Sequence, residues 1–184
     1  MALTAEILFV NPDYLKRLTN LSGAVDDDRI VPSVIIAQDL QIQQILGTDL
    51  YEKIKSEIKA GTITGAYETL LDKYIRKATA WHTMVDLIPN LYVKMDNGSL
   101  VIRTSENSVT ITEADLHREI ERARQNAQFY SYRLSKYLSY NSGSFSEYST
   151  NTEDKLDPTT TSYYQNGLTI SGTAKFDKLK YLTS

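Results

Sequence analysis

The sequence predicts a mainly α-helical protein, a bundle of about five helices with a small β-hairpin and an extended C-terminal arm. Three observations lead to this prediction. Apolar residues repeat at steps of four and three over long segments, capping and breaking residues stand between these segments, and the composition changes abruptly at Asn141. We therefore expect a helical core over residues 1–140 and an arm rich in Ser, Thr and Tyr over residues 141–184.

Capping residues and breakers place the first three helices. Asn11-Pro12 supplies a capping side chain and a proline suited to a first helical position, which predicts a helix over 12–19. The carboxylates of Asp26–Asp28 favour a second helix over about 28–46, with Pro32 tolerated in its first turn. A third, short helix is expected between Thr48 and Gly61.

The two longest helices carry the clearest periodicity, and we expect them to pack along each other because each shows a single apolar stripe. Pro89 is expected to end or kink the first of them. The stripes comprise Tyr67, Leu71, Tyr74, Ala78, Trp81, Val85 and Ile88 in one helix, and Leu116, Ile120, Ala123, Ala127, Tyr130, Leu134 and Tyr137 in the other.

A β-hairpin is expected near residues 99–112, between the two long helices. Leu100–Thr104 and Val109–Thr112 are apolar and β-branched, and a short polar segment joins them. Leu91–Met95 is a candidate third strand across the Asn97-Gly98 turn. Thr112 and Asp115 also stand in an approximate capping-box relation at the start of the last helix.

Composition excludes several classes of protein. The chain has 184 residues and no cysteine, so it offers neither a thiolate nucleophile nor a thiolate metal site. With a net charge of −3 and interspersed acids and bases it shows no basic stripe, which argues against direct binding of nucleic acid. No apolar run is long enough to span a bilayer, so we expect a soluble protein with no membrane partner, made in a cytoplasm.

We expect no catalytic, metal or cofactor site. The chain contains no phosphate loop, dinucleotide-binding glycine pattern or nucleophile elbow, and its two histidines, His82 and His117, fall on different predicted helices. Glu113, His117 and Glu121 share one helical face, so a metal-dependent helical enzyme is one alternative, but a solvated face next to Arg118 and Arg122 explains them better. The run Asp26–Asp28 is better explained by helix capping than by a cation site.

Tyrosines and other apolar residues concentrate towards the end of the predicted arm, where a merely solvating tail would not need them. Tyrosine combines a large apolar area with a polar group, and it is enriched in protein interfaces. We therefore expect an interface that includes two hairpin positions as well, formed by Val101, Val109, Tyr163, Tyr164, Leu168, Ile170, Phe176, Leu179, Tyr181 and Leu182.

Several motifs over about residues 3–140 recur in the same order in a known family. They are Ile36-Ala37-Gln38-Asp39, Ile45-Leu46-Gly47-Thr48-Asp49-Leu50-Tyr51, Thr69-Leu70-Leu71-Asp72-Lys73-Tyr74-Ile75, Ala80-Trp81-His82, Ser105-Glu106-Asn107-Ser108 and Ala127-Gln128-Phe129-Tyr130. With these residues the chain resembles the head–tail connector, or adaptor, proteins of tailed bacteriophages, particularly phages of Bacteroidetes. None of these motifs is catalytic.

The resemblance implies a structural protein of the virion neck. Such subunits form a ring, commonly dodecameric, that joins the portal protein to downstream neck or tail proteins and extends a channel through which double-stranded DNA passes without specific binding. The alternative is a cellular helical adaptor or regulatory protein whose C-terminal tail folds on a partner.

Overall fold

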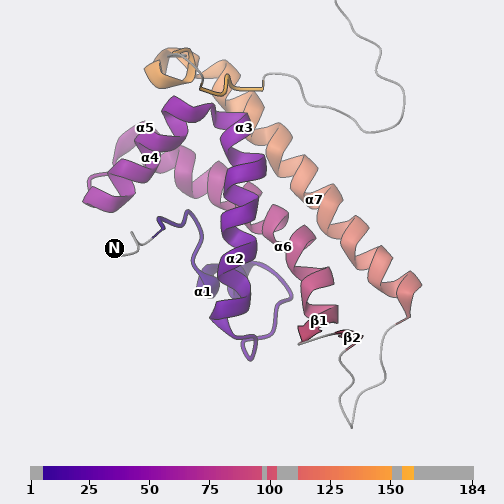
Figure 1. Ribbon diagram of the computed structural model, residues 1–184. Helices are drawn as coiled ribbons and strands as arrows, with labels where there is room; N and C mark the ends of the chain where they lie inside the picture. The colour runs from indigo at the N-terminus through magenta and orange to yellow at the C-terminus, as the bar shows by residue number, and fades with distance from the viewer. Residues whose placement is uncertain (1–5, 97–98, 103–111, 151–154, 160–184) are drawn as a thin grey trace, which may run out of the picture.

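The computed structural model describes residues 6–96, 99–102, 112–150 and 155–159. Within them the chain is mainly helical, as expected, and five continuous helical segments pack into one bundle (Figure 1). The first is α1 (Pro12–Leu18), which Asn11 caps by accepting a 2.8 Å hydrogen bond from the amide of Tyr14. Asn11 and Pro12 thus act as the sequence predicts.

The second segment runs unbroken from α2 (Asp27–Ala37) through a π-helical turn, Gln38–Ile42, into α3 (Gln43–Leu46). Its limits agree closely with the prediction, but two details differ. Pro32 is the sixth residue of α2 and thus lies beyond its first turn, and the side chain of the N-cap residue Asp26 makes no capping hydrogen bond. Gly47 separates α3 from α4 (Thr48–Ala60), which ends at Gly61 in the left-handed conformation.

The fourth segment is the central one. It comprises α5 (Gly65–Leu70), a π-helical turn, Leu71–Ile75, and α6 (Arg76–Tyr92). The expectation that Pro89 ends this helix is wrong, because α6 continues for three residues beyond it. Proline has no amide to donate to the carbonyl four residues earlier, but the amide of Val93 donates to the carbonyl of Pro89 and closes the last turn.

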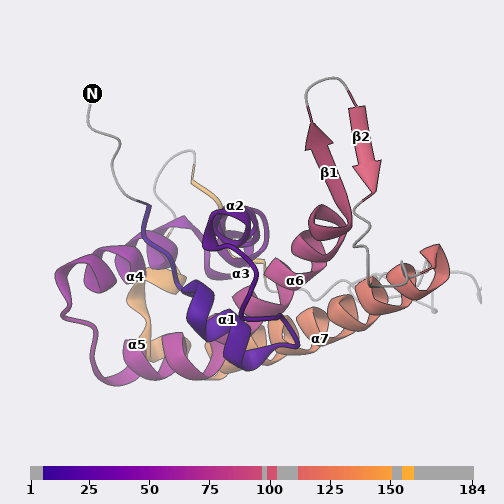
Figure 2. The same ribbon diagram turned by 90° about the horizontal axis from the view of Figure 1, so that it is seen from below.

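The fifth segment is α7 (Glu113–Tyr140), and it packs along α6 as the matched stripes predict. Thr112 caps α7, since its hydroxyl oxygen accepts a 3.2 Å hydrogen bond from the amide of Asp115. Figure 2 shows α6 between α2 on one side and α7 on the other. The core therefore has two helix–helix interfaces that share α6.

Two short strands stand out from the end of α6 (Figure 2). In β1 (Val93–Asp96) and β2 (Ser99–Ile102) the chain pairs antiparallel, with Val93 opposite Ile102. The candidate third strand of the prediction thus forms one strand of the pair. The predicted partner strand Val109–Thr112 lies outside the described residues, except for Thr112 at the start of α7.

The N-terminal segment before α1 is fixed to the core by a buried glutamine. The amide of Phe9 donates to Oε1 of Gln38 at 2.6 Å, and Nε2 of Gln38 donates to the carbonyl of Ile7 at 3.1 Å. Phe9 is buried edge-to-face against Tyr51, with ring centroids 5.2 Å apart. These contacts hold the N-terminal segment on the α2 and α4 side of the bundle.

Candidate interaction surfaces

The core continues beyond the end of α7, into residues that were expected to belong to the C-terminal arm. Two short 3-10 turns, Ser142–Ser144 and Ser146–Tyr148, follow α7. Phe145 between them is fully buried and Tyr148 is almost so. These two aromatic side chains extend the core beyond Tyr140, where the predicted helical core ends. They supply buried apolar area in a segment that is otherwise rich in serine.

Tyr67 of α5 joins this segment to the core. Its ring packs edge-to-face on Phe145, with centroids 5.3 Å apart, and its hydroxyl donates a 2.6 Å hydrogen bond to Glu147. Burial and then the neighbouring carboxylate raise the pKa of Tyr67 to about 12. Burial tends to raise the pKa of Glu147, but hydrogen bonds, first of all from Tyr67, hold it below its ordinary value.

Residues 155–159, which we call the C-terminal strap, cross the junction between α3 and α4. The amide of Thr48 donates to the carbonyl of Leu156 at 3.1 Å, and the amide of Leu156 donates to Oγ1 of Thr48 at 3.1 Å. The amide of Thr159 donates to the carbonyl of Gln44 at 2.7 Å. The strap is thus held by its backbone to the end of one helix and the start of the next.

Asp49 adds an ionic contact to the strap. Its carboxylate lies 2.7 Å from Nζ of Lys155 and accepts a 2.9 Å hydrogen bond from the hydroxyl of Thr150. The hydrogen bond from Lys155, followed by that from Thr150, lowers the pKa of Asp49. Thr48 is the first residue of α4, and its hydroxyl oxygen accepts the hydrogen bond from the strap.

Gly47 allows the strap to approach the backbone closely. Its φ of +75° belongs to a region that side chains disfavour, and a Cβ at this position would lie 2.9 Å from Cδ of Pro158. Glycine at 47 therefore serves both the turn between α3 and α4 and the seat of Pro158.

The outward side of α7 carries aromatic and basic side chains in its second half. Phe129 is 56% exposed and Tyr132 44% exposed. The guanidinium of Arg133 lies 5.8 Å from the centroid of the Phe129 ring, and the ammonium of Lys136 lies 5.6 Å from that of Tyr132. We call Phe129, Tyr132, Arg133, Lys136 and Tyr140 the aromatic–basic face.

The outward side of α2 and the turn that follows it carries a different kind of surface. Ile36 is 42% exposed and Leu40 56% exposed, and Asp28 and Pro32 are exposed at the same four-residue spacing. We call Asp28, Pro32, Ile36, Asp39 and Leu40 the acidic–apolar face. Sequence periodicity alone missed both faces, because it selects residues that point into the core. For the aromatic–basic face the available signal is Phe129, an aromatic residue that lies off the predicted stripe of the last helix.

The histidines lie apart from each other. His82 is largely buried between α6 and α7, where its Nε2 lies 2.8 Å from the hydroxyl of Ser131, and burial lowers its pKa to about 4. His117 is exposed on α7, 3.7 Å from Glu113, while Glu121 pairs with Arg124. Among the described residues, no group of three or more His, Asp or Glu side chains is arranged to hold a metal ion.

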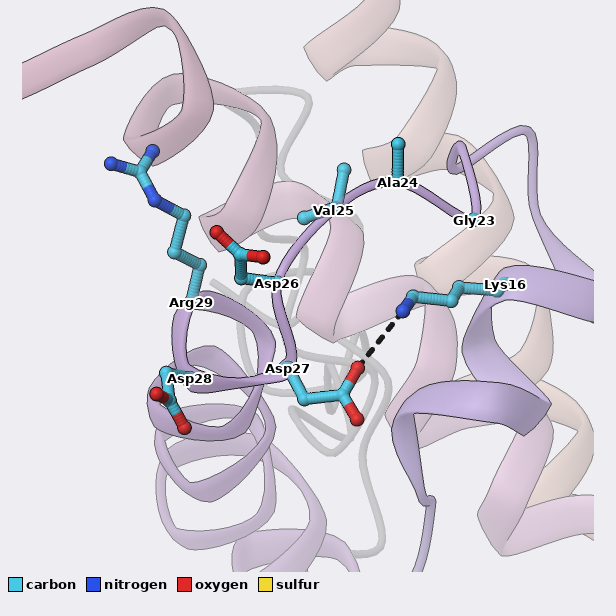
Figure 3. A pocket seen from close by; sticks show the side chains of 8 residues that line it. All are labelled: Lys16, Gly23, Ala24, Val25, Asp26, Asp27, Asp28 and Arg29. Carbon is cyan, nitrogen blue, oxygen red and sulfur yellow. Dashed lines mark hydrogen bonds and ion pairs between the residues drawn. The ribbon is translucent and has the colours of Figure 1, made fainter.

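The three aspartates at the start of α2, Asp26–Asp28, line an open hollow beside α1 (Figure 3). Asp27 pairs with Lys16 at 2.9 Å, whereas the carboxylates of Asp26 and Asp28 point in other directions (Figure 3). Three carboxylates that diverge cannot share one cation. Their position at the helix start, with its positive dipole end, explains them.

Of the predicted interface residues, Val101 lies in β2, opposite Lys94 of β1. The others lie outside the described residues, namely Val109, Tyr163, Tyr164, Leu168, Ile170, Phe176, Leu179, Tyr181 and Leu182. The expected interface at these positions therefore remains a prediction.

The fold of the described residues defines a helical bundle protein. A family model matches residues 42–157, more than half of the chain, and the protein thus belongs to a family of unknown function, DUF6712. The match extends to the strap and so includes Phe145 and Tyr148. No curated protein and no solved structure matches the chain. In the part of the chain that the structure describes, no helix combines the length and apolarity needed to cross a bilayer.

Proposed function

We propose that the chain is a structural subunit of the neck of a tailed bacteriophage. In this role it forms a ring, commonly of twelve copies, beneath the portal protein, carries the downstream neck or tail proteins and extends the DNA channel. It would be made in the bacterial cytoplasm and reside in the virion. The proposal starts from the resemblance to head–tail connector proteins.

The observation that carries the proposal is the place of the resembling residues in the fold. One of the two seven-residue motifs, residues 45–51, forms the junction of α3 and α4, where Leu46, Leu50 and Tyr51 are buried and Gly47 has positive φ. A second, residues 69–75, contains the π-helical turn that joins α5 to α6. Residues that set helix junctions specify one architecture, so their likeness favours a shared fold.

The shape of the bundle also suits assembly. Its exposed aromatic, aliphatic and charged side chains lie on helices held by a packed core, and such rigid surfaces lose little entropy on association. The moderate net charge of −3 is compatible with DNA that passes without being gripped.

A gene disruption tests the proposal in the phage genome that carries this gene. If the protein joins head to tail, a phage with a stop codon in this gene accumulates filled heads and free tails that do not join, and supplying the protein in trans restores tailed particles. Normal tailed virions from the disrupted phage would contradict the proposal. That outcome, with a monomeric protein, would favour the cellular adaptor.

A further inference from the structure

The two exposed faces are complementary in chemistry. Residues 26–46, which include the acidic–apolar face, contain four aspartates and one arginine, whereas residues 125–140 contain Arg133 and Lys136 and no acidic residue. Each face has an apolar centre, made of Pro32, Ile36 and Leu40 in one and of aromatic rings in the other. Opposite charges around apolar centres are what two surfaces need in order to bind each other.

The two faces lie on different helices of the bundle. The central segment α6 contacts both helices, with α2 on one side and α7 on the other (Figure 2). The spans of the two faces are similar, about 18 Å from Asp28 to Leu40 and about 16 Å from Phe129 to Tyr140 at roughly 1.5 Å per helical residue. A helix of one copy can therefore lie along the helix of the next.

From these observations we infer that the acidic–apolar face of one copy binds the aromatic–basic face of the next copy. This contact is heterologous, since unlike surfaces of identical chains meet, and a heterologous contact repeats into a closed ring or a filament. In it the aromatic rings of Phe129 and Tyr132 cover Ile36 and Leu40, while Arg133 and Lys136 approach Asp28 and Asp39. The inference rests on the proposed ring and names the surfaces that build it.

Two variants of the full chain test this contact. Leu40→Lys places a positive charge at the centre of the acidic–apolar face, and Lys136→Glu reverses a charge on the aromatic–basic face. Both side chains are exposed, so the fold should persist, which far-UV circular dichroism and thermal melting check. We expect each variant alone to raise the concentration needed for half assembly at least about tenfold in sedimentation velocity.

A mixture of the two variants gives the decisive measurement. The Leu40→Lys protein retains an intact aromatic–basic face, and the Lys136→Glu protein retains an intact acidic–apolar face. Because each component supplies the one face that the other lacks, the mixture should form a one-to-one dimer and nothing larger. Matched controls are Gln41→Lys, next to Leu40 on the same helix, and Arg124→Glu, about a third of a turn round α7 from Lys136; both should assemble like the wild type.

The outcomes separate the two proposals. Variants that assemble like the wild type, or a mixture that stays monomeric while the wild type assembles, would overturn the proposed contact and leave the neck function standing. A wild-type chain that stays monomeric both alone and with portal protein would overturn both.

Discussion

Tyr67 and Glu147 lie eighty positions apart in the chain, yet the tyrosine hydroxyl donates a 2.6 Å hydrogen bond to the carboxylate. This bond fastens the segment after α7 to the start of α5. We expect Tyr67→Phe to lower the free energy of unfolding by about 1.5–3 kcal/mol, the range for a hydrogen bond to a charged group. Urea denaturation at neutral pH measures the change.

Tyr140→Phe is the matched control for this substitution. Tyr140 is 86% exposed, so loss of its hydroxyl should change stability by less than about 0.5 kcal/mol. Equal effects of the two substitutions would show that the Tyr67 hydroxyl does not stabilise the fold. Because the pKa of Glu147 is lowered, the stabilisation is present above its unfolded pKa and should disappear as the pH falls through its folded value.

Phe145 should be as important to stability as a core residue of the helices. Since its ring is fully buried, Phe145→Ala should cost about 3–5 kcal/mol. A chain that ends at Tyr140 should likewise melt well below one that ends at Thr150, because only the longer chain keeps Phe145 and Tyr148. Equal melting temperatures of the two shortened chains would show that the core ends with α7.

Gly47 offers a test of the strap. Gly47→Ala should cost about 1–3 kcal/mol for its backbone conformation and more for the contact with Pro158. A chain that ends at Thr150 lacks Pro158, so Gly47→Ala should destabilise that chain less. Gly61→Ala, at a positive φ with no neighbouring atom within 4 Å, should cost the same in both chains. If Gly47→Ala cost the same free energy of unfolding in both chains, the strap would not contact Gly47.

His82 should make stability depend on pH. Its pKa is about 4 in the folded chain, against about 6.5 in an unfolded chain, so the unfolded state takes up the proton first as the pH falls. The free energy of unfolding should therefore decrease by about 2 kcal/mol between pH 6.5 and pH 5. His82→Gln should flatten this decrease, whereas His117→Gln, on the exposed side of α7, should leave it unchanged. A His82→Gln protein with the wild-type pH profile would refute the assignment.

The sequence predicted the helices better than the packing of α6. In α7 one stripe suffices, because only one side of that helix packs on the core. Helix α6 is central and also buries Thr79 and Thr83. The predicted apolar stripe leaves these two residues out because threonine is polar. Their hydroxyls donate to the carbonyls four residues earlier, at 2.9 and 2.8 Å, so these polar residues are satisfied within their own helix and can be buried.

Contacts between distant segments explain the other differences. Gln38 is a polar residue whose burial depends on the N-terminal segment, and Phe145 stands alone in a Ser-rich stretch, so neither belongs to a local period. The exposed Phe129 and Leu40 break the amphipathic pattern of their own helices. Because periodicity describes a helix against one core, it cannot show which apolar residues of a helix remain exposed.

We propose that this protein assembles as a ring on a portal. Native mass spectrometry of the purified chain, mixed with a portal protein from the phage in which the gene is found, tests this proposal. The proposal predicts one complex in which a fixed number of copies, commonly twelve, joins one portal ring. A spectrum that contains only free portal and monomeric chain, at concentrations well above those in an infected cell, would contradict it.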